Sequence, residues 1–152
     1  RSRGVLIMLH YVACGLSNVW LVNGFTEKTV DGKSYFSVEN PKELHKAIGF
    51  DLAKKHTTLD GDEIRFLRTE MALSRKTLAE YFGCSPEAVK KWESGENPIQ
   101  KPSDALLRSL FVEFHNEKSS VKETLEVINQ LEKDAVELRF AEDKQGKWGK
   151  AA

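Results

Sequence analysis

The sequence predicts an α+β protein, with short strands at its beginning and capped helices through the rest of the chain. Residues 8–38 contain short runs rich in β-branched and aromatic side chains, separated by turn signals. From residue 40 onward, helix caps are followed by apolar residues that recur three and four positions apart. We therefore expect three parts: a β-rich module with one helix at 1–57, an all-α bundle at 58–115, and an amphipathic helix with a tail at 116–152.

The charge balance limits the kinds of partner that the chain can hold. Its 152 residues are 40% hydrophobic and 30% charged, which is typical of a soluble globular protein. The 23 basic residues are balanced by 23 acidic ones, and residues 60–114 contain 8 Lys plus Arg against 10 Asp plus Glu. Broad affinity for nucleic acid usually needs a basic domain. Any such binding must then depend on a locally basic face and on specific contacts.

Cysteine content and hydropathy indicate a cytoplasmic protein. Cys14 and Cys84 are too few for a disulfide framework and are not spaced as metal ligands, which suits a reducing cytosol. The longest apolar run, residues 5–9, is too short to span a bilayer. We expect no membrane association and no signal peptide, with Met8 as a native start.

The N-terminal module is expected to be a three-stranded antiparallel meander covered by one helix. The expected strands are Leu9–Ala13, Asn18–Val22 and Ser34–Val38, with turn signals at Asn23-Gly24 and Asp31-Gly32. The buried face of this sheet would carry the aromatic residues Trp20, Phe25, Tyr35 and Phe36. A helix capped by Asn40 would cover that face with an apolar stripe and end near residues 54–55; the stripe is Leu44, Ala47, Ile48 and Leu52.

Residues 73–98 are the stretch around which the bundle is expected to be organised. Ser74 is a good N-cap for a first helix, and Gly83 ends that helix where a left-handed residue is needed. Ser85 caps a second helix with Pro86 at its first position, where a missing N–H costs nothing. Two short capped helices joined by a tight turn predict a helix-turn-helix.

The second of these helices has a charged face that suits DNA. Its apolar residues Val89 and Trp92 face the first helix, and four residues project together on the other side: Pro86, Glu87, Lys90 and Lys91. A helix fits the major groove, where Lys can donate to guanine and Glu can accept from cytosine. The alternative is a small bundle whose exposed face happens to be charged, with Glu87 and Lys91 as a surface pair. The agreement of caps, turn and spacing favours DNA binding.

Leu73–Gly95 resembles the signature of the XRE family, the Cro and phage-repressor type of helix-turn-helix, which is similar to L-S-x-x-x-L-A-x-x-x-G-x-S-x-x-x-V-x-x-W-E-x-G. The resemblance implies a compact lambda-repressor-like helical bundle, of prokaryotic or phage type, that binds a palindromic operator as a dimer. By position it places Arg75, Ser85, Pro86, Glu87 and Lys91 at the DNA, with Ser74 and Ser94 near phosphates and Lys101 on a loop along the DNA backbone. It also implies a structural ion pair between Arg68 and Glu93.

Two further helices are expected after this stretch. Ser103 would cap a helix that ends at Phe114 and closes the bundle. Ser120–Glu123 is a capping box, and apolar residues then recur at helical spacing as far as Leu138. This amphipathic helix either packs on the N-terminal sheet or pairs with a second copy of the chain. We favour a homodimer, because helix-turn-helix proteins need two half-sites about one DNA turn apart. Residues 141–152 are polar and expected to fray.

A weaker resemblance covers the N-terminal module. Residues 11–24, YVACGLSNVWLVNG, look like the N-terminal region of XRE regulators related to MqsA-type antitoxins. MqsA-type proteins carry zinc there on two CxxC pairs, whereas this segment contains only Cys14. His10 and Cys14 lie in a strand and a loop and need not converge, so we expect neither a metal site nor a cofactor.

The chain shows no catalytic constellation, since a Gly-rich phosphate loop, a nucleophile elbow and an HExxH motif are all absent from the sequence. We therefore expect no enzyme but a transcriptional regulator, most simply a repressor that blocks polymerase on double-stranded DNA. Two alternatives remain open. The N-terminal module of an antitoxin-like protein would hold a toxin or other protein partner, with DNA binding serving to autoregulate its operon; or the module would sense a small molecule.

Overall fold

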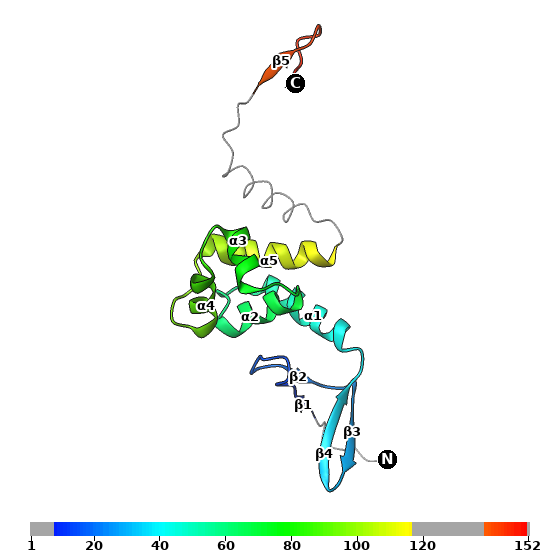
Figure 1. Ribbon diagram of the computed structural model, residues 1–152. Helices are drawn as coiled ribbons and strands as arrows, with labels where there is room; N and C mark the ends of the chain where they lie inside the picture. Colours follow the sequence, from blue (N-terminus) through cyan, green and yellow to red (C-terminus); the bar gives the residue numbers. More distant parts are fainter. Residues whose placement is uncertain (1–7, 117–138, 152) are drawn as a thin grey trace.

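The computed structural model describes residues 8–116 and 139–151, and within them the protein has an α+β architecture (Figure 1). Five helices follow one another along the chain in the described region, with two-stranded antiparallel sheets before and after them. The α+β class predicted from the sequence is therefore confirmed. No helix within these two ranges combines the length and the apolar character that crossing a lipid bilayer requires.

The N-terminal strands pair differently from the predicted three-stranded meander. β1 (Leu9–His10) pairs with β2 (Trp20–Leu21), and β3 (Phe25–Val30) pairs with β4 (Lys33–Val38), giving two separate hairpins. The turn signal at Asp31-Gly32 does join two strands, because Val30 is opposite Lys33. The meander was wrong because β3 exposes nearly all of its residues and so lacks the buried alternation that reveals a strand.

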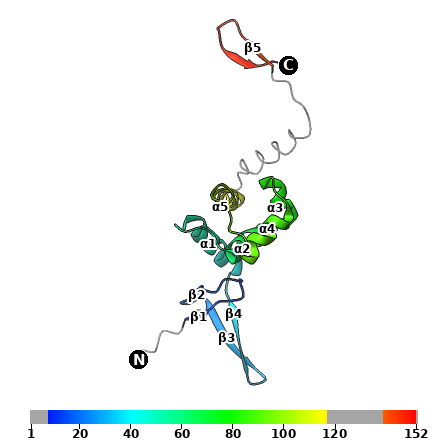
Figure 2. The same ribbon diagram turned by 90° about the vertical axis from the view of Figure 1, so that its left-hand side faces the viewer.

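The aromatic residues assigned to a buried sheet face are mostly exposed. Trp20 is 54% exposed, and Tyr35 and Phe36 on β4 are 53% and 46% exposed. Trp20 stacks on His10 at 4.1 Å between ring centroids, and Phe25 meets Phe36 edge-on at 6.0 Å. These rings therefore contact neighbours within their own hairpins. The β3–β4 hairpin extends away from the helices in both views (Figures 1 and 2).

α1 (Pro41–Lys54) ends where the sequence predicts. It packs against the helix α5 (Lys101–His115) on one side as well as against the β1–β2 segment on the other. Asn40 occupies the N-cap position with φ 47° and makes no side-chain capping bond, so the predicted cap does not form. Gly49 on one side of α1 lies against the Phe111 ring of α5. The predicted stripe of α1, together with Leu16 and Leu21 of the β1–β2 segment, lines a groove of about 430 Å³.

Two of the remaining helices, α3 (Arg75–Phe82) and α4 (Pro86–Ser94), begin at the caps predicted from the sequence, and α5 does not. α2 (Gly61–Glu70) starts with a capping box between Asp60 and Glu63, and Ser74 caps α3. Ser85 caps α4. The helix α5 begins before the predicted cap Ser103 because Pro102 fits its first turn.

One hydrophobic core continues across the boundary predicted at residue 57. Leu52 of α1 and Leu59 belong to the same buried cluster as Leu67, Val89 and Phe111. The connection between α1 and α2 is held on α5: Asp104 accepts the Leu59 N–H at 2.8 Å, and Arg108 donates to the carbonyls of Lys55 and Thr57 at 2.5 and 2.7 Å. α1 therefore shares its hydrophobic core with the helices that follow residue 57.

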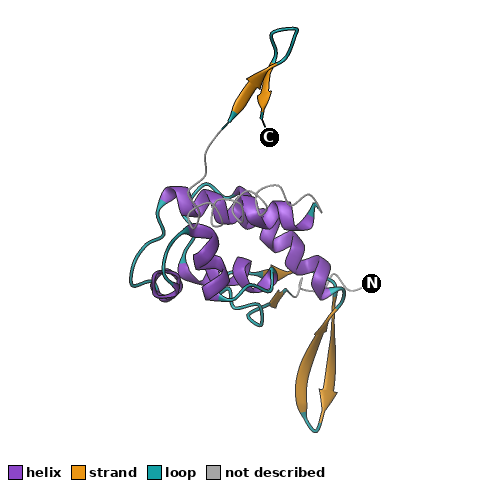
Figure 3. Ribbon diagram, turned by 45° about the horizontal axis from the view of Figure 1, so that its top comes forward, coloured by secondary structure: helices purple, strands orange, loops and turns teal. Residues whose placement is uncertain are grey.

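The C-terminal part contains a hairpin where the sequence predicts a frayed tail. β5 (Phe140–Glu142) pairs with β6 (Trp148–Lys150) in an antiparallel ladder (Figure 3). The chain turns between them at Asp143, whose carboxylate accepts the N–H groups of Gln145 and Lys147. The amphipathic helix predicted for residues 120–138, with its dimerisation role, lies outside the described residues, as do residues 1–7 that precede the expected start.

Candidate nucleic-acid interface

The turn between α3 and α4 is fixed by local hydrogen bonds. Gly83 adopts a left-handed φ of 67°, which a side chain would strain, and the Cys84 N–H donates to the Ala79 carbonyl at 3.0 Å. The Ser85 hydroxyl accepts the Ala88 N–H at 3.2 Å, and Pro86 occupies the first helical position. The chain therefore enters α4 in a conformation that its own sequence determines.

The inner sides of α3 and α4 pack closely. Leu78 and Ala79 of α3 and Val89 of α4 are fully buried. Trp92 is only partly buried, with its ring 6.1 Å from that of Phe82. Val89 rather than Trp92 is therefore the main anchor of α4. This packing leaves the opposite side of α4 to solvent.

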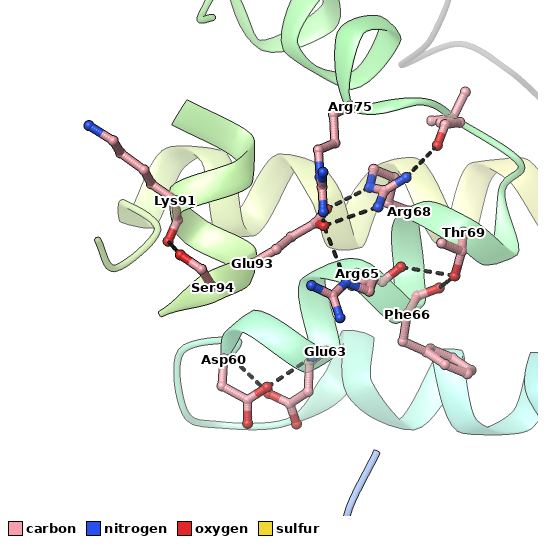
Figure 4. Close-up of polar contacts among 11 residues, drawn as sticks. Asp60, Glu63, Arg65, Phe66, Arg68, Thr69, Arg75, Lys91, Glu93 and Ser94 are labelled. Atoms are coloured by element: carbon pink, nitrogen blue, oxygen red, sulfur yellow. Dashed lines mark hydrogen bonds and ion pairs between the residues drawn. The ribbon is translucent and has the colours of Figure 1, made fainter. Parts of the chain in front are cut away.

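Glu93, near the end of α4, is a fully buried carboxylate surrounded by arginines (Figure 4). Arg68 donates to both of its oxygens, at 2.5 Å from Nε to Oε2 and 3.0 Å from Nη2 to Oε1. Arg75 donates from Nε to Oε1 at 3.0 Å, and Arg65 from Nε to the same oxygen at 3.4 Å. The structure thus forms the ion pair implied by the resemblance, and extends it to an arginine cluster of Arg65, Arg68 and Arg75 that joins α2, α3 and α4.

The arginine cluster carries a local excess of positive charge. Burial alone would raise the pKa of the Glu93 carboxyl. The hydrogen bonds and charges of Arg68 and Arg75 lower the pKa by more than burial raises it, so the net pKa lies below the ordinary value. Three guanidinium charges against one carboxylate charge leave an excess of two positive charges. The side chains of Arg65 and Arg75 are 50% and 37% exposed, so part of this excess reaches the surface.

The predicted reading face of α4 is open to solvent. Pro86, Glu87, Lys90 and Lys91 are all exposed. Lys91 lies 3.7 Å from Glu96 Oε2 in the following loop, and its side chain extends away from the arginine cluster in Figure 4. That ion pair is loose and exposed, so Lys91 can leave Glu96 at small cost.

The other residues predicted at the DNA are distributed around this face. Ser74 and Ser85 are exposed N-caps, and Ser94 donates to the Lys91 carbonyl at 3.2 Å. Lys101 is exposed at the start of α5. Arg75 differs from the prediction, because its Nε–H is committed to Glu93 and only part of its guanidinium is left for another partner.

Sequence reasoning did not single out Arg65. The available signal was its spacing, since Arg65 and Arg68 are three residues apart on α2 and share a face. Its partner Glu93 is distant in the sequence, however, and only the packing of α2 against α4 brings the two together.

A second polar chain connects the N-terminal segment to the bundle. The Tyr11 hydroxyl lies 2.8 Å from His45 Nε2, and His45 Nδ1 lies 2.9 Å from a carboxylate oxygen of Glu70. Burial raises the pKa of the Tyr11 hydroxyl, with smaller contributions from Cys14 and Glu70, so this group is not activated as a nucleophile. The arrangement links the segment that follows β1 to α1 and α2.

The two residues considered for a metal site make separate contacts. His10 Nε2 lies 2.6 Å from the Ser17 carbonyl oxygen, and the Cys14 thiol donates to the Tyr11 carbonyl at 3.4 Å. Among the described residues, no group of three or more His, Cys, Asp or Glu side chains is placed to hold a metal ion.

Comparisons of the chain with protein families, with curated proteins and with solved structures returned no match.

Proposed function

We propose that this chain is a sequence-specific DNA-binding transcriptional regulator, most simply a cytoplasmic repressor that acts as a dimer without enzymatic activity. One observation carries the proposal: α4 is fixed on its inner side by Val89 and Glu93, and its outer side presents Glu87, Lys90 and Lys91 to solvent. A short helix with one immobilised side and one exposed polar side is suited to insertion in a major groove.

The rigidity of α4 supports this role. Its N-terminus is held by the Ser85 cap, and its C-terminal turn is held by the arginine cluster through Glu93. A binding element that is already ordered loses little entropy when its partner binds. Base contacts made from such a helix can therefore discriminate between sequences.

The local charge supports it as well. The chain is neutral overall, yet the arginine cluster leaves an excess of positive charge beside α3, and Ser74 and Arg75 begin that helix. Backbone N–H groups at a helix start also attract phosphate. In the proposal, Ser74, Arg75, Ser94 and Lys101 face phosphates and set the position on the duplex, while Glu87, Lys90 and Lys91 face base edges and set the sequence.

The deciding experiment is footprinting on the DNA upstream of the gene that encodes this chain. The wild-type protein should protect two half-sites about one helical turn apart. Lys91→Ala should weaken protection by roughly five- to 150-fold, which corresponds to a lost base contact of about 1–3 kcal/mol. Lys54→Ala is the matched control, because Lys54 is an exposed helical lysine at the end of α1.

Equal weakening by the two substitutions would mean that only general charge matters, and it would remove the assignment of Lys91 to base reading. The absence of any protected region, together with sequence-independent binding in a mobility shift, would contradict the regulator proposal itself.

The second candidate is an antitoxin-like protein that also binds a protein partner. The observation that favours it is the β3–β4 hairpin, which exposes Tyr35 and Phe36 and leaves one edge of each strand unpaired in the described sheet. Such edges can accept an added strand from another chain. Co-expression with the product of an adjacent reading frame tests it. Retention of that product by the wild type, and its loss from a Tyr35→Ser/Phe36→Ser variant that still binds DNA, is the expected result.

A further inference from the structure

The C-terminal hairpin has two unlike faces. Its register pairs Phe140 with Lys150, Ala141 with Gly149 and Glu142 with Trp148. Paired residues share a face, and side chains alternate between faces along each strand. Within the two strands, one face therefore carries Phe140, Glu142, Trp148 and Lys150, which we call the hairpin face, and the other carries Ala141 and Gly149.

The hairpin face is uncovered in the described structure. Phe140 is 61% exposed and Trp148 is 66% exposed, and neither belongs to the hydrophobic core. Among the described strands, β5 and β6 pair only with each other. A two-stranded hairpin is marginally stable by itself in water. Two large exposed aromatics on such a small element therefore suggest that another surface contacts it.

We propose that the hairpin face binds the same face of a second copy of this chain. The two aromatics occupy one diagonal of the quartet, and the two opposite charges, Glu142 and Lys150, occupy the other. A two-fold axis along the aromatic diagonal places Phe140 on Phe140 and Trp148 on Trp148. The same axis places each Glu142 opposite a Lys150 of the second copy, twice by symmetry.

The other symmetric arrangements fit less well. An axis parallel to the strands puts Glu142 over Trp148, and an axis across the strands puts Glu142 over Phe140. Each brings a carboxylate against the negative face of one aromatic ring and leaves no ion pair between the copies, although Lys150 then lies over the other ring. An axis along the charged diagonal opposes Glu142 to Glu142 and Lys150 to Lys150, which is repulsive. A nucleic acid is also a poorer occupant, because Glu142 on the same face offsets the attraction of Lys150 for phosphate. Charge complementarity thus selects a second copy in one orientation.

This contact goes beyond the proposed DNA binding, because it identifies a dimer surface outside the helix-turn-helix and needs no DNA to be tested. Four side chains cover far less than the roughly 1,600 Å² of a standard interface, so we expect a dissociation constant in the micromolar range or weaker. The DNA-bound protein would then gain affinity from two linked half-site contacts.

The first test measures the mass of the full chain by light scattering over a series of concentrations. The wild type should shift from monomer to dimer as its concentration rises. Trp148→Ala should weaken this dimer by about tenfold or more, because a buried aromatic anchor is lost. Ala141→Lys, which changes the other face of the same strand, should leave it unchanged. A monomeric wild type at every concentration, or a dimer that Trp148→Ala does not affect, would overturn the proposal.

The second test separates contact between copies from effects within one hairpin. Glu142→Lys and Lys150→Glu each place like charges opposite one another in the symmetric dimer, so each variant alone should associate about tenfold more weakly than the wild type. When the two variants are mixed, each charged residue of one variant lies opposite an unlike charge of the other. The mixture should therefore form a heterodimer about as tightly as the wild type forms its dimer. The like charges within each hairpin persist in the mixture, so mixing cannot repair an intramolecular defect. A mixture as weak as the separate variants would reject the hairpin contact, whereas the DNA-binding proposal would be unaffected.

Discussion

Glu93 carries a buried negative charge that three arginine side chains neutralise. A buried carboxylate is costly unless it is paired, and removing one partner from a buried pair typically costs about 3–5 kcal/mol. Here the carboxylate receives hydrogen bonds from all three residues of the arginine cluster. It therefore connects α3 and α4 to α2 through its hydrogen bonds.

Glu93→Gln should destabilise the protein in a pH-dependent way. The folded pKa of Glu93 lies below its ordinary value of 4.5, so its contribution to stability is complete above that pH and is lost as pH falls through the folded pKa. The glutamine variant lacks this contribution, and its deficit in the free energy of unfolding should be roughly 2–4 kcal/mol at pH 7. The deficit should shrink below pH 4.5. Urea unfolding at a series of pH values measures it.

Glu87→Gln is the control for that measurement, because Glu87 lies exposed on the same helix. Its free energy of unfolding should stay within about 0.5 kcal/mol of the wild type. A deficit of Glu93→Gln that does not change between pH 7 and pH 3 would show that the ionised carboxylate is not the stabilising species.

Residue-level features were predictable where the interacting groups are close in sequence. The caps Ser74 and Ser85 each bond a backbone N–H three residues away, so the local pattern is sufficient to predict them. Arg65 and Arg75 reach Glu93 across 28 and 18 residues, and only tertiary packing sets those contacts. Position in a family pattern implied Arg68–Glu93, but it did not imply that Arg75 shares the same carboxylate.

At the scale of elements, the helices were more predictable than the strand pairing. The β1–β2 pairing and the turn at Asp31-Gly32 were anticipated, whereas β3 and the β5–β6 hairpin were not. Helices α2, α3 and α4 bury one side, so their sequences carry an apolar period that the caps delimit. The β3–β4 and β5–β6 hairpins are exposed along almost their whole length. A strand without a buried face has no period to detect, and its pairing then depends on turn geometry and cross-strand contacts. This explains both the incorrect meander and the incorrect frayed tail.

Gly49→Ala should loosen the contact between α1 and α5. A Cβ at Gly49 would overlap the ring of Phe111, which is fully buried. Alanine normally favours a helix over glycine by about 1 kcal/mol, so a net loss would show that packing dominates. We expect a net destabilisation of about 1–3 kcal/mol by urea unfolding, as for other overpacked cores.

Gly149→Ala is the matched control for this substitution. A Cβ at Gly149 has no atom within 4 Å and the backbone there needs no left-handed conformation. Its free energy of unfolding should be unchanged within about 0.5 kcal/mol. A Gly49→Ala variant as stable as the wild type would mean that α1 and α5 can separate without cost, contrary to a single packed core.

At the scale of the whole molecule, the net charge is zero and positive charge is concentrated only locally. Basic and acidic residues balance over the chain, and Glu87 and Glu96 lie close to the proposed DNA-reading lysines. Such a molecule gains little from a long-range attraction to DNA. In the proposed DNA complex, the affinity must come mainly from contacts that a correct sequence permits, so the preference for an operator over random DNA should be large relative to the total affinity.

The salt dependence of binding distinguishes phosphate contacts from base contacts in the proposed DNA complex. The logarithm of the binding constant falls with the logarithm of salt concentration by about 0.9 for each phosphate that a cation neutralises. Lys101→Ala should lower that slope by about 1 on the operator and on a scrambled duplex alike, because Lys101 is assigned to a phosphate. Lys91→Ala should instead weaken binding to the operator alone and reduce its ratio to the scrambled duplex. Fluorescence anisotropy with both duplexes over a salt series measures the slopes and the ratio. Tight binding to both duplexes, with Lys91→Ala and Lys101→Ala indistinguishable, would show that α4 does not read sequence.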